Sequence, residues 1–425
     1  MCESTPSEMA SCAQSSGCPL TRLLTGSTAV LALLVFLAIN FYAATKNTQV
    51  GNNKLDKSWV GWAVNDFITS AERPNVVFLG SSLMLVPLSG NDANYLHKKL
   101  DGSKHHHAQY FQDVLKKRTG YLASAYTFAL PGEMPSDAFM LTNFLLKDEK
   151  QPDVIVYGVG PRDFMDNLLP SPSATDPFRV LSQLGSIDDY ASLFLPDWQA
   201  RLDYELGKVF YFYKDREKIT GALFTQANNY INKILPAPGG GKFSIFDRRQ
   251  LLPAYHPAEL EIGEAFFRPE TAADKKRGIY DNLAEYRKRY KELKWDTFLT
   301  QMQFFANFLD TAKKRGIHVV VMAMPITEVN RSLLSDRAWN IYMHSVKALA
   351  QAKGASYINL HDSGAFQVTD FMDTVHLSPD GGKKMLDYLV ETIRSDSKTL
   401  SYLNQNKQIE TTTLAQTAKR KGNSL

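Results

Sequence analysis

The sequence has 425 residues, of which 44% are hydrophobic and 22% are charged, and its formal net charge is +4 at pH 7. This length allows one large domain or two modest ones, and so small a charge excludes nucleic acid as the expected main partner. The cysteines are Cys2, Cys12 and Cys18, so a disulfide framework or a cysteine-based metal site is excluded from the main body of the chain. Lipidation of these cysteines stays open, but free thiols are favoured because no lipidation signature surrounds them.

The first element is an uncharged apolar segment, residues 23–44, which follows a short tail of residues 1–22. It is long enough to cross the ~30 Å hydrocarbon core of a bilayer as a helix. A cleaved signal peptide is the rival interpretation, and it is disfavoured because Phe41 and Tyr42 are too bulky for the small-residue cleavage pattern. We therefore expect a single-pass membrane anchor. The lysines that follow it favour a cytoplasmic main domain under the positive-inside rule, although long domains translocate regardless of local charge.

A regular alternation of apolar runs and helical stretches follows a polar linker with a short lead-in helix, residues 45–73. Five apolar runs predict buried strands: NVVFLG at 75–80, AYTFAL at 125–130, DVIVYG at 153–158, HVVVMA at 318–323 and SYINL at 356–360. Helical composition marks residues 95–118, 136–146 and 296–315, and a last helix begins near Ser378 with Pro379 in its first turn. This alternation predicts an α/β fold with a parallel sheet covered by helices on both faces.

Residues 175–295 interrupt the alternation and contain the flexible sequence PAPGGG at 236–241. We expect an inserted, mainly helical subdomain that covers the crevice of the sheet. Its glycine run is not a phosphate-binding loop, because the Gly-Lys-Ser/Thr ending is absent. The insertion divides the α/β domain into residues 74–174 and 296–398, and the polar, basic tail of residues 399–425 is expected to be disordered.

Polar residues follow the predicted strands at their carboxyl ends, where parallel sheets bind ligands. Ser81 and Ser82 follow the first strand, and a serine at a tight strand-to-helix turn exposes its hydroxyl and presents its N–H to a developing oxyanion. Gly132 follows the second strand and allows close approach of a backbone N–H. Arg162 and Asp163 follow the third. We expect Ser81, Gly132, Arg162 and Asp163 to contact the oxyanion or the substrate. Taken singly, these residues are also compatible with a simple turn or a helix cap.

Asp373 and His376 lie three residues apart in the loop before the last helix. Such an aspartate can hold the imidazole by its Nδ1–H and leave Nε2 free to take a serine proton. The alternative is a surface loop with a helix-capping serine. The order of the polar residues along the chain favours the catalytic interpretation, with Ser82, His376 and Asp373 as a triad.

This order resembles the SGNH/GDSL hydrolase superfamily over roughly residues 75–165 and 318–395. The family's blocks match Gly80-Ser81-Ser82-Leu83, Gly132, and Asp373 with His376. The resemblance implies a flavodoxin-like three-layer sandwich with a central parallel sheet of about five strands. It also implies a serine esterase or acyltransferase without a cofactor.

The third block departs from the family, which often has Gly-x-Asn-Asp where this chain has Gly160-Pro161-Arg162-Asp163. Arg162 stands where the oxyanion-binding asparagine would be. Either Arg162 donates to the oxyanion or grips an anionic substrate, or the oxyanion hole is incomplete and turnover is lower by about 100- to 1000-fold. We expect a working site, because an intact triad would otherwise be unexplained.

The membrane-tethered layout is also similar to proteins that modify cell-envelope polymers, namely the D-alanyl transfer protein of teichoic acid modification and the alginate O-acetyltransferases. This similarity favours an acyl-ester donor, with acetyl as the group transferred. It also favours a glycan acceptor, a domain on the exterior or periplasmic side, and a membrane partner in polymer assembly. The competing hypothesis is a weakly active or inactive scaffold of the same fold that binds glycan in polymer synthesis or export.

The remaining histidines and aromatics are expected to be structural. The sequence KHHH at 104–107 lacks metal-ligand spacing, so no metal is expected. His318 opens a strand, and His361 with Asp362 follows the last strand at the rim of the crevice. The aromatic run at 205–215 is more typical of a subdomain core than of a sugar-binding platform.

Overall fold

The computed structural model describes residues 28–48, 58–214, 216–235, 266–276, 278–291 and 294–403. The chain divides into two compact units. The sheet unit comprises Lys54–Trp198 and Ala254–Leu425, and the helical unit comprises Met1–Asn53 and Gln199–Pro253. The predicted insertion is therefore divided, because its first part and its last part belong to the unit that holds the sheet.

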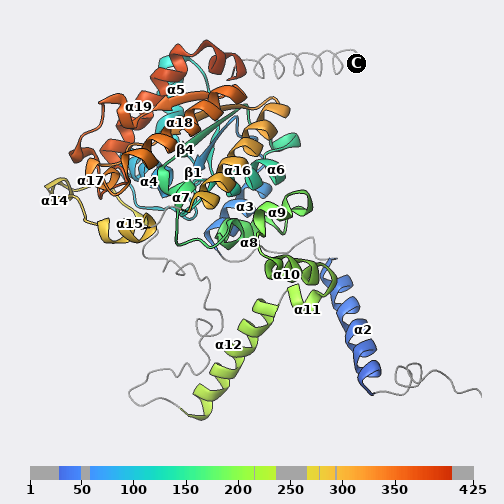
Figure 1. Ribbon diagram of the computed structural model, residues 1–425. Helices are drawn as coiled ribbons and strands as arrows, with labels where there is room; N and C mark the ends of the chain where they lie inside the picture. The colour runs from blue at the N-terminus through green and yellow to red at the C-terminus, as the bar shows by residue number, and fades with distance from the viewer. Residues whose placement is uncertain are drawn as a thin grey trace, which may run out of the picture. The chain divides into compact units, whose positions relative to one another are not determined.

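A five-stranded parallel sheet forms the centre of the sheet unit (Figure 1). Its strands, in spatial order, are β3 (Ala125–Thr127), β1 (Val76–Gly80), β4 (Val154–Val159), β6 (His318–Ala323) and β7 (Ser356–Asn359). The five predicted strands and the parallel α/β fold are confirmed. The strands β1, β4 and β6 are buried along their whole length, which explains why they are continuous apolar runs rather than alternating ones.

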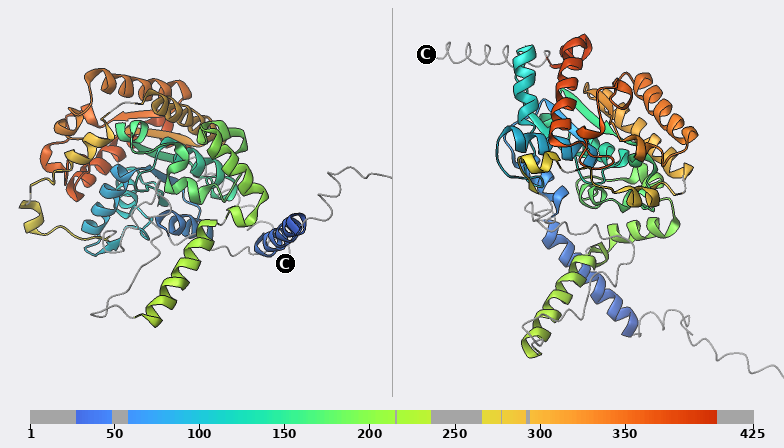
Figure 2. Two further views of the ribbon diagram at one scale, coloured as in Figure 1. Left: turned by 60° about the horizontal axis from the view of Figure 1, so that its bottom comes forward. Right: turned by 90° about the vertical axis from the view of Figure 1, so that its left-hand side faces the viewer.

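Helices of the sheet unit form two groups that pack within themselves. One group is α4 (Ser82–Tyr95), α5 (Gln109–Thr119) and α19 (Pro379–Ser395). The other is α6 (Pro135–Phe144), α7 (Pro161–Met165), α16 (Trp295–Lys314) and α18 (Asp336–Lys353). The right-hand view of Figure 2 shows the two groups on opposite sides of the sheet. The helices predicted at 136–146, at 296–315 and near Ser378 are confirmed.

The helix predicted over residues 95–118 is wrong in its first half. Helix α4 ends at Tyr95, and His97 has a positive φ of 50°. The short strand β2 (Leu100–Asp101) then pairs antiparallel with β5 (Phe266–Phe267). Helix α5 begins only at Gln109, where the Asp92 carboxylate accepts the N–H groups of Gln109 at 2.8 Å and of Tyr110 at 3.0 Å. A side chain from the preceding helix thus supplies the cap that decides where α5 starts.

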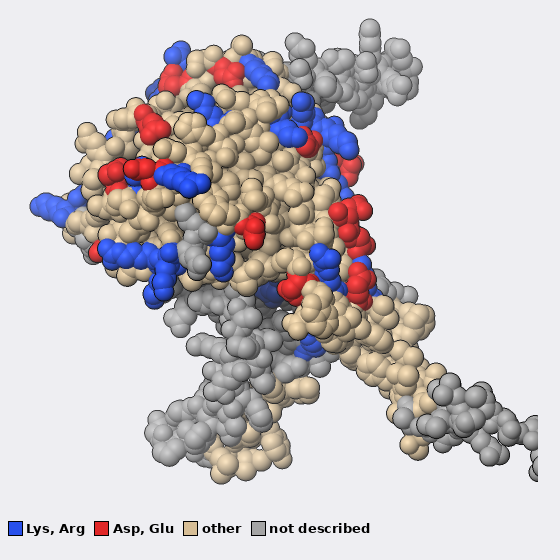
Figure 3. Space-filling view, in the orientation of Figure 1, with Lys and Arg blue, Asp and Glu red and all other residues tan. Residues whose placement is uncertain are grey.

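Shorter elements complete the sheet unit. They are α3 (Trp59–Thr69), which confirms the lead-in helix, η1 (Asp148–Lys150), η2 (Pro172–Ala174), α8 (Asp176–Leu181), η3 (Asp188–Tyr190), α9 (Ala191–Phe194), α14 (Ala272–Lys276), α15 (Leu283–Arg289), α17 (Glu328–Arg331), η6 (His361–Ser363) and η7 (Val368–Asp370). Basic and acidic side chains are interspersed on the face seen in Figure 3, as expected from the small net charge.

The first five residues of the predicted disordered tail are ordered. Residues 399–403, expected to be disordered, are helical and packed. Thr399 donates its hydroxyl to Asp396, the ring of Tyr402 stacks on His318, and Leu403 is fully buried. The rest of the predicted tail, the PAPGGG sequence and the three cysteines lie outside the described residues.

The helical unit holds α2 (Thr28–Thr48), α10 (Trp198–Val209), α11 (Tyr211–Lys214) and α12 (Arg216–Ile234). The Asn40 side chain, buried in α2, donates to the carbonyl of Val209 at 3.3 Å and accepts from the N–H of Phe212 at 3.1 Å. The ring of Phe36 lies 6.2 Å from those of Phe210 and Phe212. Part of the aromatic run at 205–215 therefore packs against the predicted anchor segment.

No helix in the described part of the chain combines the length and the apolar character needed to cross a membrane. The first residues of the predicted anchor, 23–27, lie outside the described residues. Residues 28–44 of that segment are helical. Membrane anchoring stays a prediction.

Candidate active site

Ser82, His376 and Asp373 form one continuous chain of hydrogen bonds. The Ser82 hydroxyl lies 2.8 Å from Nε2 of His376, and Nδ1 of His376 lies 2.6 Å from a carboxylate oxygen of Asp373. Ser82 is the first residue of α4, directly after β1, and the other two residues lie in the loop that leads into α19. The three residues predicted as a triad are therefore brought together at one edge of the sheet.

Asp373 organises its loop as well as the imidazole ring. Its Oδ1 accepts the backbone N–H groups of Val375 at 2.8 Å and of His376 at 2.7 Å, while its Oδ2 accepts from the ring. Burial alone would raise the pKa of Asp373, but these hydrogen bonds outweigh burial and hold the pKa below its usual value. An ionised Asp373 keeps the proton of His376 on Nδ1, which leaves Nε2 to accept the proton of Ser82.

Thr374, inside this loop, is held from two sides. Its carbonyl accepts from the backbone N–H of Thr327 at 3.1 Å and from the hydroxyl of Thr327 at 2.7 Å. Its hydroxyl accepts from the Asn330 amide at 2.9 Å and donates to Oδ1 of Asn282. Asn282 also accepts the backbone N–H of Thr374 at 3.3 Å. Two segments distant in sequence, at the start of α17 and before α15, therefore fix the loop that carries Asp373 and His376.

The turn that presents Ser82 depends on Gly80. Gly80 has a φ of 137°, and a Cβ at this position would lie 2.5 Å from the carbonyl oxygen of Gly158. Only glycine fits such a position without displacing backbone. Ser81 caps α4 by accepting the N–H of Leu83 at 3.4 Å, and it is buried. Ser81, expected to contact the oxyanion or the substrate, is a buried helix cap in the structure.

Gly132 and Arg162, two of the residues predicted to contact the oxyanion or the substrate, lie next to each other. Gly132 has a φ of 79°, and a Cβ there would lie 3.4 Å from Nη2 of Arg162. Asp166 orients the guanidinium of Arg162 by accepting a hydrogen bond from its Nε at 2.9 Å. Asp166 is itself held by Arg289, which donates to it at 2.5 Å. The terminal nitrogens of Arg162 are thereby directed toward Gly132.

The sequence model described as "Protein of unknown function (DUF1574)" matches residues 105–393, which is more than half of the chain. The chain belongs to the DUF1574 family. No curated protein sequence matches it. The DUF1574 match spans Gly132, Arg162, Asp373 and His376, and it begins after Ser82.

Glu133, Asp137 and Asp163 of this DUF1574 chain are buried carboxyls, and each accepts a backbone N–H. Glu133 accepts from Gly80 at 3.0 Å, Asp137 from Met134 at 2.9 Å, and Asp163 from Gly160 at 2.8 Å. Burial raises the pKa of Asp137 to about 7 and that of Asp163 to about 6, and it raises the pKa of Glu133 well above its usual value. Asp163, expected to contact substrate, is buried and serves as a cap.

Sequence reasoning missed Glu133, Asp137, Asn282 and Arg289. Glu133 directly follows Gly132, and that adjacency is the one local signal that could have drawn attention to it. Asn282 and Arg289 lie in the segment assigned to the insertion, and no pattern around them indicates a contact with the triad loop or with Asp166. Their roles depend on contacts across 92 and 123 positions of the sequence.

Two histidines of the KHHH sequence, His105 and His106, have structural contacts in the DUF1574 chain. His105 contacts Asp92 at 2.9 Å, and His106 is buried against the ring of Tyr126, where burial lowers its pKa to about 4. No cluster of histidine, cysteine or carboxylate side chains suited to a metal occurs among the residues described. At the rim, the ring of His361 packs 4.5 Å from that of Trp339.

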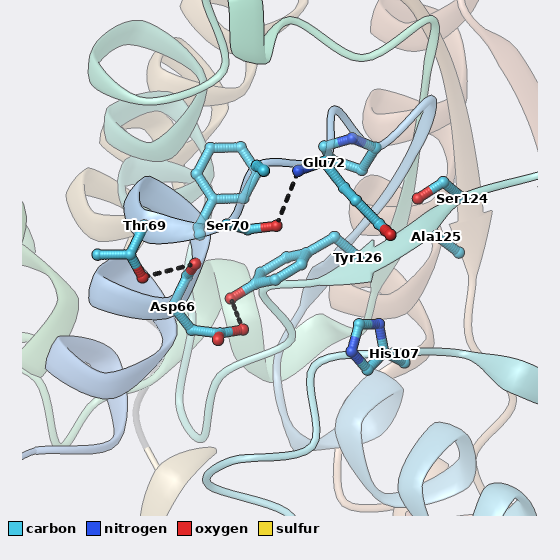
Figure 4. A pocket seen from close by; sticks show the side chains of 11 residues that line it. Asp66, Thr69, Ser70, Glu72, His107, Ser124, Ala125 and Tyr126 are labelled. Carbon is cyan, nitrogen blue, oxygen red and sulfur yellow. Dashed lines mark hydrogen bonds between the residues drawn. The ribbon is translucent and has the colours of Figure 1, made fainter.

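Figure 4 shows a hollow elsewhere on the sheet unit. Its labelled residues include Asp66, Glu72, His107 and Tyr126, and the Tyr126 hydroxyl donates to Asp66 at 3.2 Å. Ser124 and Ala125 also line it, at the amino end of β3. Because the strands are parallel, this is the end of the sheet opposite to the turn that carries Ser82.

Proposed function

We propose that the protein is a serine esterase or O-acyltransferase of the SGNH/GDSL type that works through an acyl-enzyme on Ser82. The observation that carries this proposal is the hydrogen-bonded order of Ser82, His376 and Asp373 at the carboxyl edge of the parallel sheet. The strand order β3-β1-β4-β6-β7 supports a flavodoxin-like three-layer sandwich, in which ligands bind at that edge.

The first half of the reaction forms the acyl-enzyme. His376 Nε2 takes the proton of the Ser82 hydroxyl as Oγ attacks the carbonyl carbon of an ester. Asp373 stabilises the imidazolium that forms. The backbone N–H groups of Ser82 and Gly132, with the terminal nitrogens of Arg162, donate to the negative oxygen of the tetrahedral intermediate. Collapse of that intermediate breaks the ester bond, and His376 returns the proton to the leaving alcohol.

The second half transfers the acyl group. His376 removes a proton from an incoming hydroxyl, whose oxygen attacks the acyl carbon, and Ser82 regains its proton as it leaves. Water as the acceptor gives an esterase, and a sugar hydroxyl gives an O-acyltransferase. We favour an acetyl group and a glycan of the cell envelope, on the architectural similarity to cell-envelope acyltransferases.

The proposal includes attachment to a membrane and a domain on the exterior or periplasmic side. Helix α2 supports attachment, because large apolar side chains such as Leu31, Leu34 and Phe41 are exposed along it. A partner in polymer assembly follows from the same similarity to cell-envelope enzymes.

Hydrolysis of p-nitrophenyl acetate by the full chain in detergent tests the proposal. Ser82→Ala and His376→Ala are expected to remove the activity. Ser332→Ala and His344→Ala, at exposed positions of the same unit, are the matched controls and are expected to leave it unchanged. A folded wild-type protein that is inert toward acetyl esters would favour the alternative of a glycan-binding scaffold.

A further inference from the structure

Glu133 joins the two turns on which the proposed oxyanion site depends. It is fully buried and directly follows Gly132. Its Oε1 accepts the backbone N–H of Gly80 at 3.0 Å, and Gly80 lies two residues before Ser82. One side chain therefore spans from the turn after β3 to the turn after β1.

The backbone N–H of Gly80 has Glu133 as its hydrogen-bond acceptor. Gly80 is the last residue of β1, and its carbonyl accepts the N–H of Leu130 at 2.9 Å. Its φ of 137° turns the chain sharply at this point, and the residue is buried. A buried backbone donor needs an acceptor, and Glu133 supplies one from the neighbouring turn.

The surroundings of Glu133 favour its neutral form. Burial, followed by the nearby carboxyl of Asp137 and then that of Asp163, raises the pKa of Glu133, and the hydrogen bonds from Gly80 and Leu130 only partly oppose this. The buried phenol of Tyr157 faces the same region. A neutral carboxylic acid offers the same acceptor oxygen as an amide, so glutamine should replace glutamate here without loss of the contact.

We propose that Glu133 is a positioning residue that sets the separation of the two backbone donors of the oxyanion site, the N–H groups of Ser82 and Gly132. This inference rests on the proposed function. The two donors must both lie about 2.7–3.1 Å from the same oxygen atom. The Gly80–Glu133 hydrogen bond ties together the two short turns that carry them, so losing it lets the donors move apart.

Turnover by Glu133→Gln and Glu133→Leu tests the proposal. On p-nitrophenyl acetate, Glu133→Gln is expected to keep kcat within about 3-fold of wild type. Glu133→Leu is expected to lower kcat by about 10- to 100-fold with little change in KM, because a misplacement of about 1 Å has effects of this size. Wild-type kcat in Glu133→Leu, or equal losses in both variants, would overturn the proposal.

Leu309→Ala is the control for stability, since it opens a cavity at a buried position of α16, a helix that carries neither turn. It is expected to lower Tm without lowering kcat at a temperature where the variant is folded. If Glu133→Leu does not fold, Glu133→Asp takes its place, because its carboxyl is one methylene too short to reach Gly80. A kcat in Leu309→Ala as low as in the Glu133 variant would assign the loss to stability and overturn the proposal.

Amide hydrogen exchange of the peptide containing Gly80 to Leu83 measures the Gly80–Glu133 hydrogen bond in the absence of substrate. The Gly80 amide is expected to be protected in wild type and in Glu133→Gln, and to exchange faster in Glu133→Leu. Unchanged protection in Glu133→Leu would overturn the proposal even if Ser82 is essential for hydrolysis. An esterase activity that survives Ser82→Ala would instead contradict the proposed function, independently of the exchange result.

Discussion

The Ser82 hydroxyl lies 2.8 Å from Nε2 of His376, although 294 positions of the sequence separate the two residues. The packing of α19 on α4 brings them together. Ser82 begins α4, and His376 lies three residues before α19. The contact between these two helices is therefore a direct determinant of the geometry of the triad.

Gly382→Ala tests that dependence. A Cβ at Gly382 would lie 2.4 Å from the carbonyl oxygen of Pro87 in α4, so α19 has to move away to accommodate it. We expect a loss of stability of about 1–3 kcal/mol and a fall in kcat as His376 moves from Ser82. Thermal unfolding and hydrolysis rates measure the two effects. Wild-type stability and turnover would show that the close approach of the helices is not required.

Arg162→Ala should lower kcat on p-nitrophenyl acetate by about 100- to 1000-fold if its terminal nitrogens donate to the oxyanion. Arg162→Lys should recover little of this, because an ammonium cannot keep the contact with Asp166 and also reach toward Gly132. Steady-state kinetics at saturating ester measures both variants. An effect on KM alone would instead assign Arg162 to binding an anionic group of the substrate.

Asn282 should matter for turnover although its side chain hydrogen-bonds only to Thr374 among the contacts described. Asn282→Ala removes the acceptor for the backbone N–H and the hydroxyl of Thr374, and we expect kcat to fall by about 10-fold or more as the triad loop loosens. Asn282→Asp keeps an acceptor oxygen and should lose less. Equal activity in Asn282→Ala and wild type would show that the contacts from Thr327 and Asn330 hold the loop unaided.

The buried Asp137 predicts a specific pH dependence of stability. Burial raises the pKa of Asp137 from its usual 3.8 to about 7, so between these values the folded state binds the proton more tightly than the unfolded state. The free energy of unfolding should therefore fall as pH rises through this window, by on the order of 1 kcal/mol per pH unit. Denaturant unfolding from pH 4 to pH 8 should show that Asp137→Asn lacks this contribution. Parallel pH profiles of the two proteins would contradict it.

The sheet was predictable because its central strands are buried on both faces and are therefore continuous apolar runs. The proximity of Ser82, Asp373 and His376 was predictable because Gly-Ser-Ser after a strand and Asp-x-x-His before a helix are local patterns. The start of α5 could not be predicted from local sequence, since Asp92 caps this helix from the preceding helix. The division of the insertion between the two units was not predictable either, because it depends on contacts such as that of Asn40 with Val209, 169 positions away. The contact of Glu133 with Gly80 could not be predicted, because no sequence pattern links the two residues.

Covalent labelling with a fluorophosphonate probe, followed by peptide mass analysis, tests the central claim most directly, because the probe reacts with a serine only when a base activates it. The account predicts a single adduct on Ser82 in the full-length wild-type protein, greatly slowed labelling in His376→Ala and none in Ser82→Ala. Labelling that persists in Ser82→Ala, or its absence in folded wild-type protein where a control esterase reacts fully, would contradict the account.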